Sequence, residues 1–265
     1  MSDSRPIGIF DSGVGGLTVF SEVEKVLPKE KIVYFGDTAR VPYGTKSKKT
    51  ITRFSVENVE FLMKHNVKLV LVACNTASSL SLDFLKRCFK VPVIGVIAPG
   101  ARSAVASTRN NRIGVVGTNA TIASGAYEKA VKRINSGISV YSQSCPLFVP
   151  LVEEGWTDES ITHEVASIYL KKFKNKGVDT LILGCTHYPL LKNVISSVLG
   201  SKVSLVDSAR EVAKEAGRIL TANGLLNESS ANPGHKIFVS DEPEHFIRSA
   251  ESFLRRKMKC VKKVL

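Results

Sequence analysis

The sequence predicts an α/β protein of two similar parallel-sheet domains, related by internal duplication, with a ligand site in the cleft between them. Three observations support this prediction. Strand-like apolar runs alternate with helical patterns, which is typical of parallel sheets covered by helices. Landmarks of the first half recur in the same order in the second half. Two cysteines stand at matched places, each directly after a strand-like run.

The first half contains four strand-like runs with helical patterns between them. The run KLVLVA at 68–73 is continuous and apolar, which is typical of a strand buried on both faces of a parallel sheet. Apolar residues at helical spacing begin at Leu17 and end before Pro28, because proline cannot continue a helix interior. We therefore expect strands at 6–10, 32–35, 68–73 and 91–97, and helices at 17–27 and 51–62.

The second half repeats this order at a nearly constant offset. RIGVVG at 112–117 resembles the opening PIGIFD run, and TLILG before Cys185 matches LVLVA before Cys74. Strand-like runs at 139–141 and 203–206 complete the series. Four landmarks in one order indicate two units of about 100 residues each, which is a usual domain size.

The chain beyond the second unit adds a return segment. A helical stripe begins at Ser208, the expected N-cap, and a polar loop at 227–234 precedes a strand at 236–240 and a helix at 245–254. Since no third core is available, we expect this segment to pack on the first unit. The predicted domains are residues 1–97 plus 208–265, and residues 98–207.

The 265 residues include 37 Lys and Arg against 24 Asp and Glu, a formal net charge of +13. This charge raises nucleic acid, a membrane surface or a small anion as partners. Aromatic residues make up only 7% and no nucleic-acid motif is found, so we interpret the basic C-terminus as a solvated surface and keep nucleic-acid binding as a secondary alternative. That cluster comprises Arg255, Arg256, Lys257, Lys259, Lys262 and Lys263.

The N-terminus lacks a signal-peptide pattern, and no apolar stretch is long enough to span a bilayer. We therefore expect a cytoplasmic protein without a membrane partner. The five cysteines are odd in number and none is spaced C-x-x-C, which excludes a disulfide framework and argues against structural zinc. Reduced thiols and no metal site are expected.

Cys74 and Cys185 are the strongest candidates for chemistry. Ligands of parallel α/β sheets bind beyond the carboxyl ends of the strands, so two facing units would bring these thiols to one cleft from opposite sides. A single buried cysteine is more often a small packing residue, but two at matched repeat positions favour a shared function. Cys88, Cys145 and Cys260 have no matched partner and are interpreted as structural.

Two opposed thiols suit the inversion of a stereocentre next to a carboxylate, because one face needs a base and the other an acid. A thiol is partly ionised near neutral pH and is easily tuned. Asp11, at the end of the first strand, is placed to assist Cys74, and His187 is placed to assist Cys185. The alternatives are a turn or N-cap role for Asp11 and a structural role for His187.

The surrounding residues predict an anionic substrate. Ser12 and Thr118 each lie between a strand and a helix, where hydroxyls and free N–H groups bind carboxylates. Thr121 falls in the same turn as Thr118, and further neutral donors are Asn75, Thr76 and Thr186. The stretch 13–16 lacks the glycine order and lysine of a phosphate loop, so a nucleotide is not favoured.

Two more segments carry open alternatives. Pro42, Tyr43 and Gly44 form either a simple turn or a loop that closes on the substrate. Glu153 and Glu154 form either the acidic end of a solvated helix or a carboxylate that assists the second thiol.

Five blocks of this sequence resemble the signature blocks of the glutamate racemases, within the aspartate/glutamate racemase family. They appear in the family's order and spacing, and the resemblance runs from about Ile7 to Leu254. Five blocks in order are specific, whereas any one of them is not. The blocks are FDSGVGG (10–16), DTARVPYG (37–44), ACNTA (73–77), VVGTNAT (115–121) and LGCTHYP (183–189).

The resemblance implies an isomerase that interconverts L- and D-glutamate without a cofactor, supplying D-glutamate for peptidoglycan, and that is commonly a homodimer. The catalytic cysteines match Cys74 and Cys185, with Asp11, Glu153 and His187 assisting. The same chemistry on aspartate or a hydantoin is the alternative. The implied substrate contacts are Asp11, Ser12, Pro42, Tyr43, Gly44, Asn75, Thr76, Thr118, Thr121, Cys185, Thr186 and His187.

Overall fold

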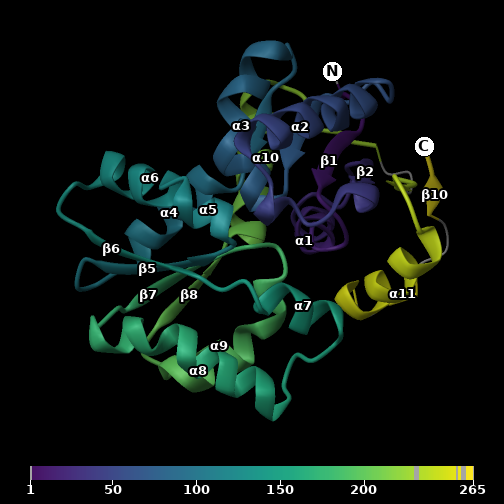
Figure 1. Ribbon diagram of the computed structural model, residues 1–265. Helices are drawn as coiled ribbons and strands as arrows, with labels where there is room; N and C mark the ends of the chain where they lie inside the picture. The colour runs from purple at the N-terminus through teal and green to yellow at the C-terminus, as the bar shows by residue number, and fades with distance from the viewer. Residues whose placement is uncertain (1, 230–232, 255, 258–260, 265) are drawn as a thin grey trace.

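The chain folds into two parallel sheets with helices around them (Figure 1). The computed structural model describes residues 2–229, 233–254, 256–257 and 261–264. The first sheet has the strand order β10-β9-β2-β1-β3-β4, and the second has the order β6-β5-β7-β8. The strands are β1 (Ile7–Asp11), β2 (Ile32–Gly36), β3 (Leu69–Val72), β4 (Val93–Gly95), β5 (Arg112–Gly117), β6 (Ser139–Ser144), β7 (Thr180–Gly184), β8 (Ser204–Asp207), β9 (Lys236–Val239) and β10 (Lys262–Lys263).

Four strands of the first sheet and the four strands of the second share one topology, which confirms the predicted α/β class and its duplication. In the first sheet β1 pairs in parallel with β2 and β3, and β3 pairs with β4. In the second sheet β5 pairs in the same way with β6 and β7, and β7 pairs with β8. The strand order reverses beside β1 and beside β5, so each sheet opens a ligand crevice at the carboxyl ends of these strands.

Helices connect the strands and cover both sheets (Figure 1). One core cluster joins the two halves, because α10 packs against β3 and β4 of the first sheet and β7 of the second, and α4 packs against α10 and against β7 and β8. The α-helices are α1 (Leu17–Val26), α2 (Lys48–Met63), α3 (Asn75–Cys88), α4 (Ile97–Ser107), α5 (Asn119–Ala123), α6 (Ala126–Ile134), α7 (Phe148–Glu153), α8 (Ser160–Asn175), α9 (Lys192–Leu199), α10 (Ser208–Ala222) and α11 (Pro243–Leu254). Short 3₁₀ turns are η1 (Thr38–Arg40), η2 (Tyr43–Thr45) and η3 (Tyr188–Leu191).

The return segment lies against the first sheet. Strand β9 pairs with β2, and β10 extends the same edge. Lys68, directly before β3, is buried, donates to the carbonyls of Asp3 and Leu225, and forms an ion pair with the Glu30 carboxylate at 2.7 Å, which ties this segment to the N-terminus. The domain boundaries at 97/98 and 207/208 stay a prediction.

Two local predictions needed correction. The strand expected over 91–97 is only Val93–Gly95, because Val96 is the N-cap of α4 and Ile97 is its first residue. Both are apolar because they are buried there. The N-cap of α10 is Asp207, whose carboxylate accepts from the N–H of Ala209 at 2.9 Å. The Ser208 hydroxyl instead bonds to Tyr127 and to the Leu183 carbonyl.

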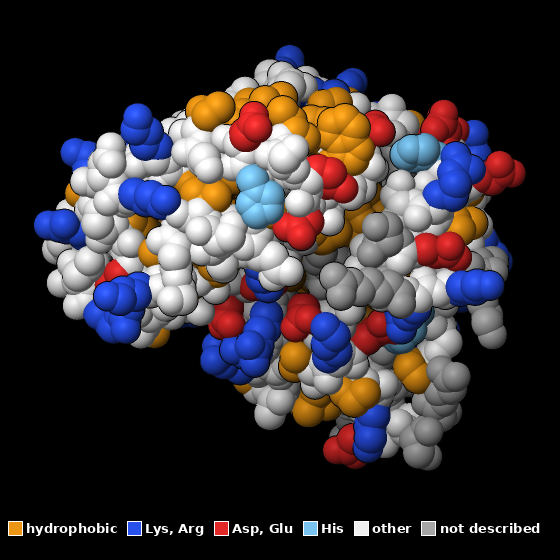
Figure 2. Space-filling model, turned by 90° about the horizontal axis from the view of Figure 1, so that it is seen from below, with side chains coloured by type: hydrophobic (Ala, Val, Ile, Leu, Met, Phe, Trp, Pro, Cys, Tyr) orange, Lys and Arg blue, Asp and Glu red, His pale blue; other side chains and the backbone are white. Residues whose placement is uncertain are grey.

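Basic side chains are dispersed on the face shown in Figure 2. Lys and Arg side chains lie both at its margin and near its middle, interspersed with acidic side chains, and form no continuous stripe. In the C-terminal cluster, Arg256 pairs with Glu24 at 2.6 Å and Lys263 with Asp241 at 2.6 Å. Arg255, Lys259 and Cys260 lie outside the described residues. In the described part of the chain, no helix combines the length and apolar character needed to cross a bilayer.

Candidate active site

A cavity of about 330 Å³ lies between the two sheets at the carboxyl ends of their strands. Residues after β1 and β3 form one wall, and residues after β5 and β7 form the other. Its volume suits a small metabolite. The predicted site residues that line it are Ser12, Pro42, Tyr43, Gly44, Cys74, Asn75, Thr76, Thr118, Glu153, Cys185, Thr186 and His187.

Cys74 lies between β3 and α3, at the N-cap position of the helix. Its side chain is nearly buried, and Sγ lies 3.8 Å from the Ser12 hydroxyl oxygen. Burial, and then the nearby Asp11 carboxyl, raise the pKa of the Cys74 thiol to about 12. The sulfur therefore stays protonated until a neighbour or the substrate stabilises its charge.

Asp11 ends β1 and is fully buried behind Cys74. Its Oδ2 accepts from the N–H groups of Gly13 at 3.2 Å and Gly16 at 2.9 Å, while Oδ1 has no hydrogen-bond partner. Burial raises the pKa of Asp11 to about 6, although the charge of His187 acts in the opposite direction. This carboxyl can change its protonation state near neutral pH, which a proton acceptor for a thiol needs.

Cys185 follows β7 and faces a histidine instead of a carboxyl group. Its Sγ lies 3.9 Å from Nδ1 of His187, and Nε2 of His187 lies 3.0 Å from Oε1 of Glu153 at the end of α7. Burial alone would lower the pKa of His187, but the contacts with Cys185 and Glu153 outweigh it and raise the pKa to about 10. A protonated imidazole thus stands beside this sulfur at neutral pH.

The structure separates the two adjacent glutamates. Glu153 contacts His187, whereas Glu154 is the exposed C-cap of α7. Gly15, in the first half of the molecule, packs closely against His187 of the second half. A Cβ on Gly15 would overlap the Thr186 hydroxyl and the His187 ring. Only glycine permits this close approach of backbone to side chain.

Three threonine hydroxyls join the two halves at the cavity. Thr76 on α3 lies 2.9 Å from Thr118 and 3.3 Å from Thr121, and Thr118 lies 3.0 Å from Thr121. Thr118 is the N-cap of α5 and accepts from the N–H of Thr121 at 3.3 Å. Thr121 is buried behind Thr118 and does not line the cavity, and the same is true of Asp11. In this structure Thr121 reaches the cavity only through its contacts with Thr118 and Thr76, and Asp11 only through its electrostatic effect on Cys74.

The segment 41–45 closes one end of the cavity. The Val41–Pro42 peptide bond is cis, and the buried Tyr43 donates its hydroxyl hydrogen bond to Asp37 and accepts one from Asn58 at 3.0 Å. Gly44 lies against Thr118 of the other half, since a Cβ on Gly44 would come within 2.9 Å of the Thr118 Cβ. Pro42 and Gly44 are thereby held at the cavity wall.

Several lining residues were not predicted. Pro146, Val149 and Pro150 reach the cavity from the segment around α7, and no local sequence signal marks them. Asn119 was detectable, because it directly follows Thr118 in the polar cluster after β5. The remaining unpredicted lining residues are Gly13, Val41 and Thr45.

No lysine or arginine belongs to the cavity lining in the described structure, so no amine stands ready for a Schiff base there. Within the described ranges, no cluster of His, Cys, Asp and Glu is arranged to hold a metal ion.

The other described cysteines are not part of the cavity lining. Cys145 is buried in the core of the second half, and Cys88 is exposed at the end of α3. The arrangement offers two thiols, each with its own acid–base partner, on two walls of one cavity.

Known proteins are similar to this chain in both sequence and architecture. The model of the Asp/Glu/hydantoin racemase family matches residues 8–216. The chain belongs to this family. A glutamate racemase of Geobacter metallireducens is 55% identical over 254 residues, which covers 96% of this chain and 94% of the relative.

Solved structures of the family superpose along the whole chain. A glutamate racemase isoform from Bacillus anthracis has a TM-score of 0.95 at 42% identity and covers 98% of this chain and 97% of its own. The glutamate racemase of Francisella tularensis, solved with D-glutamate, has a TM-score of 0.93 at 41% identity and covers 99% and 98%. The family fold, with two parallel sheets, is therefore that of this chain.

Proposed function

We propose that this chain is a glutamate racemase that interconverts L- and D-glutamate through two thiols and without a cofactor. The observation that carries the proposal is that Cys74 and Cys185, at matched ends of β3 and β7, line opposite walls of one cavity and have different acid–base partners. Relatives named glutamate racemase at 55% and 51% identity support the substrate.

In this mechanism each thiol serves one face of the α-carbon. With D-glutamate, the Cys74 thiolate removes the α-proton, and the Cys185 thiol delivers its proton to the opposite face. With L-glutamate, Cys185 removes the proton and Cys74 returns one. Each turnover leaves the two sulfurs with exchanged protonation states, so the enzyme returns to its starting form by turning over the other enantiomer or by exchange with solvent.

The partners set the protonation of each sulfur. Asp11, with its unpartnered Oδ1, serves Cys74, and Ser12 lies 3.8 Å from the same sulfur. The imidazolium of His187, held by Glu153, stabilises the Cys185 thiolate. Hydrogen bonds to a developing anion in a water-poor site are a large source of catalysis.

Neutral donors bind the carboxylates of the substrate. The N-terminus of α3 presents N–H groups beside Asn75 and Thr76, and helix N-termini favour anions. Asn75 is held in place by a 2.7 Å hydrogen bond from the Tyr127 hydroxyl, which in turn contacts Ser208. The remaining substrate contacts that the resemblance implies are Pro42, Tyr43, Gly44, Thr118, Thr121, Cys185, Thr186 and His187.

We place the enzyme in the cytoplasm as a homodimer that supplies D-glutamate for peptidoglycan, as the resemblance to the glutamate racemases implies. Sedimentation of the purified protein tests the dimer, and D-glutamate auxotrophy of a deletion strain tests the supply role.

The direct test is incubation of purified, dialysed protein with L-glutamate alone. We expect equal amounts of the two enantiomers at equilibrium, with no added cofactor. Parallel reactions with L-aspartate and a hydantoin distinguish the alternative substrates. Turnover of either of these in preference to glutamate would contradict the proposed specificity.

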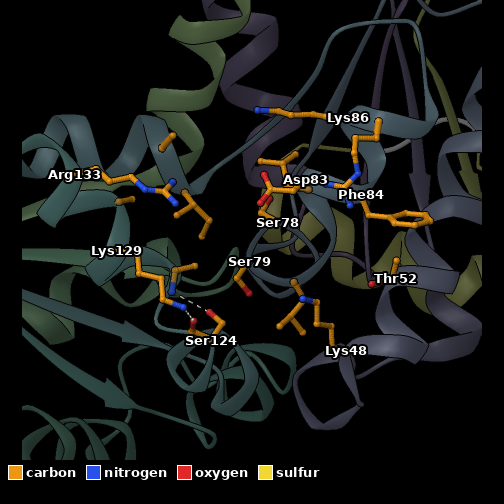
Figure 3. Close-up of a pocket in the computed structure, with 17 residues that line it drawn as sticks. Lys48, Thr52, Ser78, Ser79, Asp83, Phe84, Lys86, Ser124, Lys129 and Arg133 are labelled. Carbon is orange, nitrogen blue, oxygen red and sulfur yellow. Dashed lines mark hydrogen bonds between the residues drawn. The ribbon is translucent and has the colours of Figure 1, made fainter.

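A second observation favours an anionic effector. A cavity of about 820 Å³ between α3 and α6 is lined by Lys48, Lys86, Arg87, Lys129 and Arg133 against the single carboxylate of Asp83, and Figure 3 shows several of these cations around it. Helix α3 runs from Asn75 at the active site to this cavity. The glutamate racemase of Escherichia coli, 29% identical, was solved with L-glutamate and the activator UDP-MurNAc-Ala.

We propose that a nucleotide-linked anion of this kind binds here. Titration with UDP-MurNAc-Ala should raise kcat/KM, and the paired substitution Lys86→Ala with Arg133→Ala should remove the response. Lys171→Ala with Lys174→Ala on α8 is the matched control. No response of the unaltered protein, or a response that survives the paired substitution, would contradict this role.

A further inference from the structure

The His187 ring is enclosed by both halves of the molecule. Cys185 and Thr186 contact its Nδ1, Glu153 contacts its Nε2, and Gly15 packs against its edge. A further neighbour of the ring is Phe253, near the end of α11. The two ring centroids are 5.4 Å apart and the planes are at 90°, which is a favourable edge-to-face arrangement.

We propose that Phe253 is a positioning residue, which holds the His187 imidazole in line between Glu153 and Cys185 and keeps water from that side of the ring. This inference rests on the proposed racemase function. It assigns to the C-terminal helix a part in the second thiol's half of the site.

Phe253 is well placed for this because it belongs to both halves. Its side chain packs on the core cluster around β1, α1 and α10 and also on the core cluster of the second sheet. Helix α11 lies against α1, and Figure 1 shows it on the side of the molecule where α7 lies. The return segment joins the first sheet through β9, yet its last aromatic side chain supports the histidine that follows β7.

A third cavity shows what Phe253 separates. About 390 Å³ of polar space lies between α1 and α9, and its lining includes Phe253 and the Lys192–Asp207 pair but neither His187 nor Cys185. Glu22 and Lys25 of α1 face the same space. The phenyl ring is therefore part of the wall between these charged groups and the imidazole.

Removal of the ring would open His187 to this polar space. Water then competes for the contacts with Glu153 and Cys185, and the imidazole gains freedom to rotate. Misplacement of a catalytic partner by about 1 Å costs up to about 10²-fold in rate.

The kinetic test compares Phe253→Ala and Phe253→Tyr with Phe246→Ala. Phe246 is on the same helix and buried, but its ring packs on Tyr34, whereas the ring of Phe253 packs on His187, so Phe246→Ala reports the cost of loosening α11. We expect Phe253→Ala to lower kcat by about 10-fold or more, with little change in KM. The pH dependence of kcat should also shift in this variant. Phe253→Tyr should restore most of the rate, and Phe246→Ala should lower stability without moving the pH profile.

A readout independent of activity separates this inference from the proposed function. The imidazole N–H of His187, assigned in ¹⁵N spectra by its loss in His187→Asn, should exchange slowly with solvent in the unaltered chain. In Phe253→Ala the exchange should be at least about 10-fold faster, as expected for a locally opened site. Equal exchange rates in the two proteins, or kinetics in Phe253→Ala equal to those of Phe246→Ala, would overturn the proposal. Failure of the unaltered chain to racemise glutamate would instead count against the proposed function.

Discussion

The two walls of the cavity are built from the same strand arrangement but give their thiols opposite surroundings. Cys74 follows β3 and faces a buried carboxyl group, which together with burial raises its pKa to about 12. Cys185 follows β7 and faces an imidazole whose pKa is raised to about 10. Duplication of the fold thus supplies the positions of the two sulfurs, and single side chains supply the difference between them.

This difference indicates the starting form of the enzyme. In the proposed mechanism, a protonated Cys74 and a Cys185 beside an imidazolium are the form that removes a proton from L-glutamate and delivers one on the other face. Most of the substitutions proposed next change a residue on one wall of the cavity and leave the other wall in place.

The largest effect is expected from loss of either sulfur. Cys74→Ser and Cys185→Ser should each lower racemisation by about 10³-fold or more, because a hydroxyl is a far weaker acid and proton transfer by a positioned group contributes 10²- to 10⁴-fold. Cys88→Ser, at the exposed end of α3, is the matched control and should keep full activity. Chiral chromatography of the product measures all three, and near-normal activity in either active-site variant would refute the two-thiol scheme.

Gly15→Ala should come next, with a loss of about 10²-fold in kcat. Its new Cβ would overlap Thr186 and the His187 ring, so the imidazole must move away from Cys185. The control is Gly217→Ala in α10, where a Cβ meets only ordinary contact and helix propensity predicts stabilisation by about 0.5–1 kcal/mol. A Gly15→Ala enzyme with unchanged kcat would show that His187 is not confined as described.

Substitution of the partner on each wall should produce asymmetry between the enantiomers. His187→Asn should slow proton removal by Cys185, and Asp11→Asn should slow removal by Cys74. The kinetic isotope effect with α-deuterated L-glutamate should therefore grow more in His187→Asn, and that with α-deuterated D-glutamate more in Asp11→Asn. Equal changes in both variants would indicate that the two partners do not belong to separate thiols.

A smaller effect concerns stability and pH. The pKa of Asp11 is raised to about 6 in the folded chain, so its contribution to stability is full below about pH 4 and is lost as pH rises through 6. The loss is on the order of 3 kcal/mol. Asp11→Asn should therefore gain more in Tm, relative to the unaltered chain, at pH 8 than at pH 4. Asp83→Asn, at an exposed position, should show no such difference.

The smallest effect tests the net charge of +13. If the positive surface draws glutamate to the cavity, kcat/KM should fall modestly between low salt and 0.5 M NaCl, because salt screens exposed charges. A kcat/KM independent of salt would remove this role. The dispersed cations in Figure 2 agree with a modest effect.

The sequence predicted the parts of this molecule that repeat. Matched strands and matched cysteines were recognisable because each lies next to its own periodic or apolar run. The class, the strand positions and the meeting of the two thiols at one cavity followed from these patterns. Asp207 rather than Ser208 as the N-cap, and the early start of α4, were missed because burial shifted these boundaries by one or a few residues.

The contacts between the halves were not predictable in the same way. The choice of Glu153 over Glu154 depends on where α7 ends, and the fit of Gly15 against His187 depends on how the two sheets meet. Phe253 lies 66 residues after His187 in the chain, and its role comes entirely from the docking of α11. Such contacts are properties of tertiary packing, which local spacing does not encode.

The central claim is that two different bases act on opposite faces of one α-carbon. It is tested most directly by racemisation of L-glutamate in D₂O, stopped at low conversion and analysed by mass spectrometry of the separated enantiomers. We predict deuterium at the α-carbon of the D-glutamate product and almost none in the remaining L-glutamate. Retention of the original hydrogen in the product, or equal deuterium in both enantiomers from the start, would contradict the account.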